Sequence, residues 1–272
     1  MIGEPPAYPM AAVLGKIRLM PFARYPSLHD RVVFITGGGS GIGAAMVEAF
    51  VAQSANVAFV DIAEAESVAL VAKLAGAPQP PLFLNCDVTN VSALEAAMVE
   101  ARQRLGPISV LVNNAANDAR QRAGEITESD WDRAMSVNLK HQFFAAQAAR
   151  RSMLELGGGS IINLSSIIWQ VGAMRVAAYA TAKAGVIGLT SSLAREFGPD
   201  NIRVNAIAPG AIITERQRRL WISDDDLQHI LARQCLDRVL VGDDVARMAL
   251  FLAADDSAGV TKQCFVVDGG LR

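Results

Sequence analysis

Three side chains that could carry acid–base chemistry lie close together along the chain: Ser166, Tyr179 and Lys183. Tyr179 and Lys183 are four residues apart in a segment with a helical pattern, so they share one face of the predicted helix. A tyrosine hydroxyl has an unperturbed pKa of about 10 and is a poor base at neutral pH. A neighbouring ammonium group favours the phenolate and lowers that pKa. With Ser166 placed to hold a reacting oxygen, the three residues predict proton transfer at a substrate oxygen.

A glycine-rich loop, Thr36–Gly43, follows an apolar run and opens a helical pattern. Glycines at this spacing allow a tight turn and a close approach of the backbone to a pyrophosphate. The N-terminus of the next helix offers free N–H groups to the phosphates. The loop therefore predicts a dinucleotide site, whose oxidised nicotinamide would further lower the pKa of Tyr179. Its predicted cofactor residues are Gly37, Ser40, Gly41, Ile42 and Gly43.

An acidic residue, Asp61, ends the second apolar run, 18 residues after Gly43. A carboxylate about 20 residues beyond such a loop accepts hydrogen bonds from the adenosine ribose, and it repels a 2′-phosphate. The next residues, Ile62 and Ala63, offer no cation to bind that phosphate, and the glycine loop has no basic residue. The sequence therefore predicts NAD, in preference to NADP, as the cofactor.

Polar and small residues also follow the third and fourth apolar runs, at Cys86–Val88 and Asn113–Ala116. Ligands of open parallel sheets bind outside the carboxyl ends of the strands. We therefore expect both segments to line the cofactor groove. The groove residues predicted in this way are Asp87, Val88, Asn114, Ala115 and Ala116.

Apolar strands that alternate with longer, Ala-rich helices must position these residues. The predicted strands are 32–36, 57–61, 82–85, 110–113, 160–164, 203–206 and 264–267. The predicted helices are 42–54, 63–74, 91–105, 130–156, 178–197 and 243–253. This alternation indicates an α/β fold, a single doubly wound Rossmann-type domain whose seven-stranded parallel sheet has helices on both faces. Two short helical patterns, 214–221 and 224–234, interrupt it and predict a helical lid at about 214–241.

The length of 272 residues fits one large domain, predicted at 25–272 after an irregular N-terminal extension at 1–24. The net charge of −2 argues against a nucleic-acid binder, and 51% hydrophobic residues argue against a disordered chain. No apolar run is long enough for a signal peptide or a membrane span. The three cysteines lack CxxC spacing and are expected to be reduced, buried thiols of a cytoplasmic protein. The scattered histidines predict no metal site.

In combination, these features resemble the short-chain dehydrogenase/reductase superfamily from about Tyr25 to Arg272. Thr36–Gly43 resembles the family's TGxxxGxG loop, and Asn113–Ala116 resembles its NNAG element with alanine in the last position. Lys262 stands where a glycine is common in the family, which predicts a local effect at that turn. The PGxIxT element beside the nicotinamide is matched by Pro209, Gly210, Ile212 and Thr214.

The resemblance implies four catalytic residues: Asn138, Ser166, Tyr179 and Lys183. Tyr179 would be the general acid/base, and Lys183 would lower its pKa and hold the nicotinamide ribose. Ser166 would orient the reacting oxygen, and Asn138 would hold a water that relays protons from Lys183. Family members are tetramers or dimers, which implies a homo-oligomer packed through the helices that hold Asn138 and Tyr179.

A narrower likeness links the chain to bacterial NAD-dependent sugar 1-dehydrogenases of the D-xylose 1-dehydrogenase type. It rests on Tyr25–Leu28, Ser166–Trp169, Gln234–Leu236, the ending Val267–Arg272, and Asn117 with Asp118. It implies oxidation of an aldose at C1 by NAD, giving an aldonolactone. Amide and carboxylate groups would bind the sugar hydroxyls, and an aromatic ring would cover a C–H face. The implied substrate residues are Asn117, Asp118, Ser166, Trp169 and Tyr179.

Other interpretations remain open at this stage. The same fold could reduce a 3-oxoacyl thioester or another ketone, or oxidise a polyol or a steroid alcohol. A dinucleotide-sensing or scaffold protein is a non-enzymatic alternative, although such proteins lose the tyrosine or the lysine. Arginines at 150 and 151, and at 216, 218 and 219, could contact nucleic acid, but charge runs this short are usually solvated helix faces.

Overall fold

Seven parallel strands form one sheet in the computed structural model, which describes residues 21–272. Their order is β3-β2-β1-β4-β5-β6-β7, which confirms the predicted doubly wound α/β fold. β1 lies inside the sheet between β2 and β4, and every one of its side chains is buried. The strands are β1 (Val32–Thr36), β2 (Asn56–Asp61), β3 (Leu82–Asn85), β4 (Val110–Asn113), β5 (Gly159–Leu164), β6 (Ile202–Pro209) and β7 (Cys264–Val267).

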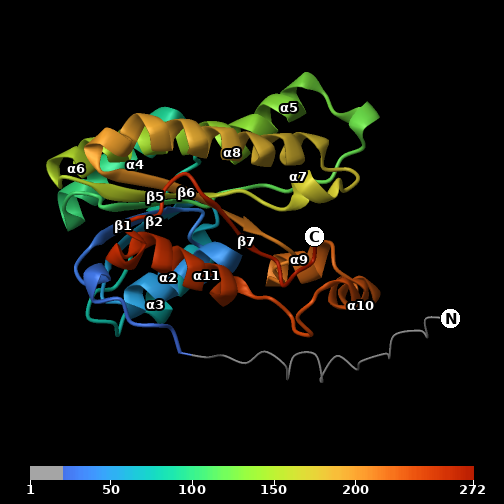
Figure 1. Ribbon diagram of the computed structural model, residues 1–272, viewed down its shortest axis with the longest axis horizontal. Helices are drawn as coiled ribbons and strands as arrows, with labels where there is room; N and C mark the ends of the chain where they lie inside the picture. Colours follow the sequence, from blue (N-terminus) through green and yellow to red (C-terminus); the bar gives the residue numbers. More distant parts are fainter. Residues whose placement is uncertain (1–20) are drawn as a thin grey trace.

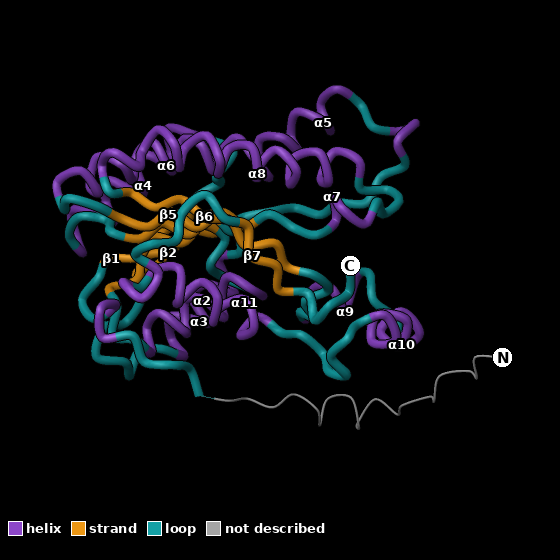
Figure 2. Tube along the Cα trace, in the orientation of Figure 1, coloured by secondary structure: helices purple, strands orange, loops and turns teal. Residues whose placement is uncertain are grey.

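Helices cover both faces of the sheet (Figure 1). One face carries α2 (Gly41–Ala52), α3 (Glu64–Lys73) and α11 (Gly242–Ala253). The other carries α4 (Val91–Leu105), α6 (His141–Glu155) and α8 (Ala177–Phe197), and Figure 2 shows the strands enclosed between the two helical layers.

Each face of the sheet has its own hydrophobic core, because successive side chains of a strand point to opposite faces. In β1, Val33 and Ile35 pack in the core beneath α2 and α11, whereas Val32 and Phe34 pack in the core beneath α4 and α6. Both sides of the strand are therefore apolar, as a sheet covered on both faces requires.

The predicted helix 130–156 is interrupted. It divides into α5 (Glu128–Met135), a π turn η3 (Ser136–Lys140) and α6. The side chains of Thr127 and Asp130 cap the start of α5 reciprocally, so this helix begins earlier than predicted. The prediction of a single α-helix was wrong at the π turn, which contains Asn138. The remaining short helices are η1 (Pro26–Leu28), η2 (Ala123–Glu125), η4 (Gly198–Asp200) and η5 (Asp255–Ser257).

Three short helices lie at the carboxyl edge of the sheet. The predicted lid contains α9 (Glu215–Leu220) and α10 (Asp224–Arg233), as expected. The four-residue helix α7 (Ile168–Val171), between β5 and α8, was not predicted. Figure 1 shows α7, α9 and α10 at the same end of the molecule as the C-terminus. These connections are placed to cover a ligand at the strand ends.

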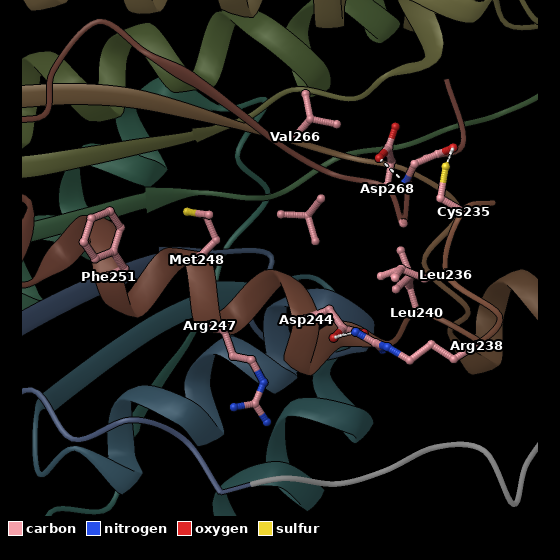
Figure 3. Close-up of a pocket in the computed structure, with 13 residues that line it drawn as sticks. Cys235, Leu236, Arg238, Leu240, Asp244, Arg247, Met248, Phe251, Val266 and Asp268 are labelled. Atoms are coloured by element: carbon pink, nitrogen blue, oxygen red, sulfur yellow. Dashed lines mark hydrogen bonds and ion pairs between the residues drawn. The ribbon is translucent and has the colours of Figure 1, made fainter.

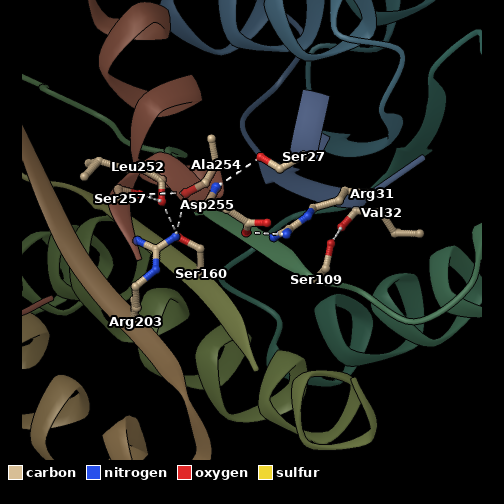
Figure 4. Close-up of polar contacts among 10 residues, drawn as sticks. All are labelled: Ser27, Arg31, Val32, Ser109, Ser160, Arg203, Leu252, Ala254, Asp255 and Ser257. Atoms are coloured by element: carbon tan, nitrogen blue, oxygen red, sulfur yellow. Dashed lines mark hydrogen bonds and ion pairs between the residues drawn. The ribbon is translucent and has the colours of Figure 1, made fainter. Parts of the chain in front are cut away.

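The opposite edge of the sheet is closed by polar contacts (Figure 4). Ser160 Oγ donates to the carbonyl of Leu252 at 2.8 Å, and Arg203 donates to the carbonyl of Ala254 at 3.2 Å. Arg31 pairs with Asp255, which joins the segment before β1 to the segment after α11. These contacts satisfy backbone carbonyls at the end of α11 that have no partner within the helix.

The N-terminal part of the described chain lies against the domain. Phe22 packs against the core beneath α2 and α11, and Gln53 Nε2 donates to the carbonyl of Ala23 at 2.8 Å. The predicted extension at 1–24 has residues 1–20 outside the described part of the chain. The domain boundary at residue 25 stays a prediction. No helix of residues 21–272 is long and apolar enough to cross a membrane.

The structure corrects one expectation about side chains and explains one unusual residue. Cys86 is buried as expected, but Cys235 and Cys264 are exposed, so the prediction that all three thiols are buried was wrong. Both exposed cysteines lie at the C-terminal side of the domain, where fewer elements cover the chain. Lys262 adopts φ +62°, the left-handed region that favours glycine, which explains why glycine is common there.

We expect Thr36→Val to destabilise the protein, because the buried Thr36 hydroxyl accepts hydrogen bonds from the N–H groups of Asn114 and Ala115. Two buried donors would lose their partner, which lowers the free energy of unfolding by roughly 1–3 kcal/mol. Urea denaturation measures this change. Thr36→Ser keeps the hydroxyl and is the matched control. A Thr36→Val protein as stable as the wild type would contradict this account of the β1–β4 junction.

Candidate active site

The glycine loop joins β1 to α2 and is held in a tight turn. Gly37 has φ +67°, which favours glycine, and its N–H donates to the carbonyl of Val60 in β2 at 2.8 Å. A Cβ atom on Gly43 would lie 1.8 Å from the carbonyl oxygen of Gly37, so no other residue fits there. Beyond the loop, the first N–H groups of α2 have no partner within the helix. This cradle fits a dinucleotide phosphate.

Asp61, at the end of β2, holds the loop from the side. Its Oδ2 accepts from the N–H of Gly39 at 2.8 Å, and its Oδ1 accepts from the N–H of Ala63 at 2.9 Å. Each carboxylate oxygen can accept a further hydrogen bond. The carboxylate therefore lies beside the loop with capacity left for a ribose hydroxyl, as the sequence predicts. Ile62 follows and is 71% exposed.

The segment after β4 is tied to the same loop. Asn114 Nδ2 donates to the carbonyl of Gly37 at 2.7 Å, and its N–H donates to Thr36 Oγ1 at 3.0 Å. Ala115 donates to the same hydroxyl at 3.1 Å, and Ala116 beyond it is exposed. β1 and β4 thus end in one hydrogen-bonded unit at the groove.

The three residues predicted for acid–base chemistry lie together at the carboxyl end of β5. Tyr179 and Lys183 are on α8, and Lys183 Nζ lies 5.6 Å from the centre of the Tyr179 ring. The Ser166 hydroxyl hydrogen-bonds to Tyr179 and also accepts from the N–H of Ile168 at 3.2 Å. Lys183 is buried, and its Nζ donates to the carbonyl of Leu164 at 2.7 Å.

The sequence predicts that Lys183 lowers the pKa of Tyr179, but in the structure the largest influence on this pKa is burial. Burial raises the pKa of Tyr179, and the charge of Asp118 raises it further. The Ser166 hydrogen bond and the charge of Arg216 lower that pKa, with a smaller effect than burial. Burial also lowers the pKa of Lys183 to about 7, since the charged amine is poorly solvated there.

Asn138 lies in the π turn and holds the segment after β4. Its Nδ2 donates to the carbonyls of Asn117 at 3.0 Å and Ala134 at 2.9 Å, and its Oδ1 accepts from the N–H of Asn117 at 2.9 Å. Its main-chain carbonyl accepts from Gln142 Nε2 at 3.1 Å. The side chain thus acts as a clamp on residue 117. The predicted role of Asn138 in a proton relay stays a prediction.

The segment after β6 reaches back over the glycine loop. Gly210 donates to the carbonyl of Val267 at 2.9 Å, and Ile212 forms an isolated parallel bridge with Leu240 at the base of the lid. Thr214 caps α9, and a Cβ atom on Gly41 would lie 3.2 Å from its Cγ2. The segment 209–214 therefore reaches the glycine loop, and its predicted contact with the cofactor stays a prediction.

Comparisons with known proteins agree with this geometry. A family model described as enoyl-(acyl carrier protein) reductase matches residues 37–272. The chain is 54% identical over 253 residues to "Probable galactose dehydrogenase GalD" of Rhizobium meliloti, covering 93% of this chain and 99% of the relative. It is 45% identical to D-xylose 1-dehydrogenase of Caulobacter vibrioides, covering 93% and 100%.

A solved structure agrees as well. A short-chain type dehydrogenase/reductase from Mycobacterium ulcerans is 29% identical, with a TM-score of 0.85 over 90% of both chains. This chain belongs to the short-chain dehydrogenase/reductase family. It is an oxidoreductase that acts on CH–OH groups, in a family that uses NAD or NADP.

Two residues of this short-chain dehydrogenase that the sequence analysis missed reach from the lid to the segment after β4. Arg216 Nη1 lies 3.2 Å from Asp118 Oδ1, and Gln217 Nε2 donates to Asp118 Oδ2 at 2.7 Å. The sequence analysis placed Arg216 in a short solvated charge run; its side chain is 45% exposed, but it also pairs with Asp118. No local sequence pattern links the lid to the segment after β4. The only local signal nearby is Thr214, which caps the first turn of α9.

His141 is a further buried residue that the sequence analysis did not place in this site. Its Nε2 lies 3.4 Å from Thr36 Oγ1, and the side chain is fully buried. Burial and the nearby charge of Lys183 lower its pKa to about 3. The imidazole of this short-chain dehydrogenase is therefore neutral at physiological pH.

Two of the predicted binding residues, Asp87 and Trp169, lie at the surface of the domain. Asp87 is exposed, and its Oδ1 accepts from the N–H and the hydroxyl of Thr89, so it closes a turn; Val88 beside it is buried. Trp169 lies on α7 and is 38% exposed, while its neighbour Gln170 accepts from Arg272. The predicted roles of Asp87, Val88 and Trp169 in binding stay predictions.

A separate cavity of about 560 Å³ lies between α11, β7 and the C-terminal loop (Figure 3). Its lining includes Cys235, Arg238 and Met248, and none of the predicted site residues belongs to it. Within residues 21–272, no group of three His, Cys, Asp or Glu side chains is placed to hold a metal ion.

We expect the stability of the enzyme to depend on pH through Lys183. Its pKa is about 7 in the folded protein and 10.5 ordinarily, so the unfolded chain binds more protons between these values. The free energy of unfolding should therefore rise with pH from 7 to 10, by up to about 4 kcal/mol. Urea denaturation at several pH values tests this.

Two variants test whether Lys183 causes this rise in the free energy of unfolding. Lys183→Met should remove the rise, whereas Lys140→Met, which removes an exposed amine on the π turn, should keep it. Equal pH dependence in Lys183→Met and the wild type would show that the amine is not held in its poorly solvated position.

Proposed function

We propose that this protein oxidises a cyclic aldose at C1 with NAD and releases an aldonolactone. The observation that carries the proposal is the grouping of Tyr179, Ser166 and Asp118 at the carboxyl edge of the sheet, where β4 and β5 lie side by side. This set suits a substrate with many hydroxyl groups. Tyr179 can accept a proton, Ser166 can hold the reacting oxygen, and the Asp118 carboxylate can bind a further hydroxyl. The names of the two relatives, a galactose and a D-xylose dehydrogenase, support the same substrate class.

In this mechanism Tyr179 is the base. Its phenolate oxygen takes the proton of the C1 hydroxyl, while Ser166 Oγ donates a hydrogen bond to the same substrate oxygen. Lys183, whose Nζ donates to the carbonyl of Leu164, would donate a hydrogen bond to the cofactor ribose. Because Tyr179 must be ionised to act as the base and burial raises its pKa, the reaction should proceed faster at alkaline pH.

NAD would supply the acceptor for the hydride that leaves C1. The glycine loop would hold its phosphates and Asp61 its adenosine ribose. The choice of NAD over NADP rests on the Asp61 carboxylate, which would repel a 2′-phosphate, and on the absence of a cation at residues 62 and 63. Residues 114–116 and 209–214 would line the rest of the groove.

Two finer inferences accompany the proposal. Asn117, Asp118 and Trp169 would contact the sugar, as the resemblance to sugar 1-dehydrogenases implies. A homotetramer or dimer in the cytoplasm is inferred from the family resemblance and from the reduced cysteines, and a sedimentation measurement would test the assembly.

The decisive assay follows NADH formation at alkaline pH with NAD and six aldoses: D-xylose, L-arabinose, D-galactose, D-glucose, L-rhamnose and L-fucose. We expect strong activity with at least one sugar and little with NADP, because the Asp61 carboxylate would repel the 2′-phosphate of NADP. No activity with any sugar, in protein that still binds NADH, would discard the sugar proposal and leave the dehydrogenase family assignment intact.

We expect Tyr179→Phe to lower aldose oxidation by roughly 10²- to 10⁴-fold, because it removes the general base and keeps the ring. Enhancement of NADH fluorescence should show unchanged cofactor binding in the variant. Full activity in Tyr179→Phe would overturn the assignment of the base.

A second candidate function is the reduction of a ketone or a carbon–carbon double bond in an acyl thioester. It is suggested by the description of the family model, an enoyl-(acyl carrier protein) reductase. Consumption of NADPH with acetoacetyl-CoA or crotonyl-CoA tests this reaction. Faster turnover of a thioester than of every aldose would favour it over sugar oxidation.

A further inference from the structure

The lid and the segment after β4 meet at a single carboxylate. Two consecutive residues of α9 approach its two oxygens, Arg216 Nη1 at 3.2 Å from Oδ1 and Gln217 Nε2 at 2.7 Å from Oδ2 of Asp118. Arg216 Nη2 also lies 3.5 Å from Asn117 Oδ1. The Asp118 side chain is only 19% exposed, so these donors hold a mostly buried carboxylate in one orientation.

The same segment is held from the opposite side by a predicted catalytic residue. Both main-chain polar groups of Asn117 are hydrogen-bonded to the Asn138 side chain, which projects from the π turn. Residues 117 and 118 therefore have little freedom when α9 is in place. A displacement of α9 would release Asp118 but leave Asn117 clamped.

Asp118 follows β4, and Ser166 follows β5, the neighbouring strand of the sheet. The charge of Asp118 acts on Tyr179, as does that of Arg216. The Asp118 Oδ1 is buried and has no hydrogen bond within the described chain besides the Arg216 ion pair. A buried carboxylate oxygen with remaining acceptor capacity favours a ligand that donates a hydrogen bond.

We propose that Arg216 and Gln217 are positioning residues that aim Asp118 at a sugar hydroxyl other than the one at C1. The inference rests on the proposed function and deepens it. Asp118 accepts a hydrogen bond from that hydroxyl, and the two lid residues keep its carboxylate in the orientation that the hydroxyl needs. The site then selects substrates with a second hydroxyl near the reacting carbon and disfavours simple alcohols.

The test compares the best aldose of the panel with its monodeoxy analogues. In the wild type, one analogue should lose roughly 10- to 100-fold in kcat/KM, since a hydrogen bond to a charged group is lost. Arg216→Met and Gln217→Leu should lower kcat/KM for the parent sugar by a similar factor, but hardly for that analogue. Arg216→Lys, which keeps the charge, should recover part of the loss.

The matched control is Arg219→Met, which removes an exposed guanidinium from the same helix and should behave like the wild type. Equal losses with the parent sugar and with every deoxy analogue would overturn the proposal, because α9 would then serve the site only as a cover. Wild-type activity in Arg216→Met and Gln217→Leu would overturn it as well.

A measurement without substrate separates this inference from the proposed function. Chymotrypsin cleavage at Trp221, just after α9, should be several-fold faster in Arg216→Met and Gln217→Leu than in Arg219→Met. If the wild type oxidises no aldose, the proposed function fails, while faster cleavage still supports the hold of the lid on Asp118. Equal cleavage rates would overturn that hold.

Discussion

The junction between β1 and β4 is the constraint on which the rest of the structure depends. The chain leaves these two central strands in opposite directions across the sheet, so a crevice opens between them. The Thr36 hydroxyl bridges the junction by accepting from Asn114 and Ala115, and the Asn114 amide holds the glycine loop. Both strand ends are therefore held together. This fixes the positions of the glycine loop, the segment at residue 117 and the ends of β5 and β6 relative to one another.

A second feature of the site is that its ionisable groups are held in unfavourable surroundings. Burial lowers the pKa of Lys183 and raises that of Tyr179, so both groups are driven towards their neutral forms. His141, fully buried beside the amine, is neutral and adds no positive charge. A ligand that brings hydrogen bonds or charge to this site can shift these equilibria, whereas a well-solvated site would respond less.

Much of this architecture could be predicted from the sequence, because apolar runs and strand ends are local signals. All seven strands and the loop at Thr36–Gly43 were predicted, with β6 extending three residues further than expected. The π turn was not, since the residues at 136–140 carry no local pattern that distinguishes it from an α-helix. The contact between Gln217 and Asp118 joins residues 99 positions apart, and neither has an unusual local context. Exposure of Cys235 and Cys264 depends on what covers the C-terminal side, which no local pattern encodes.

The π turn at Ser136–Lys140 also bears on how such a site can arise. A π turn inside an α-helix contains one residue more than an α-helical segment of the same rise, and the helices on either side stay in phase. One inserted codon can therefore bring an amide such as Asn138 to the loop beside it without rebuilding α5 or α6. The reverse deletion would leave a folded chain with its helices intact and the clamp removed. In evolutionary terms, gain and loss of this part of the site are separated by a single small insertion or deletion.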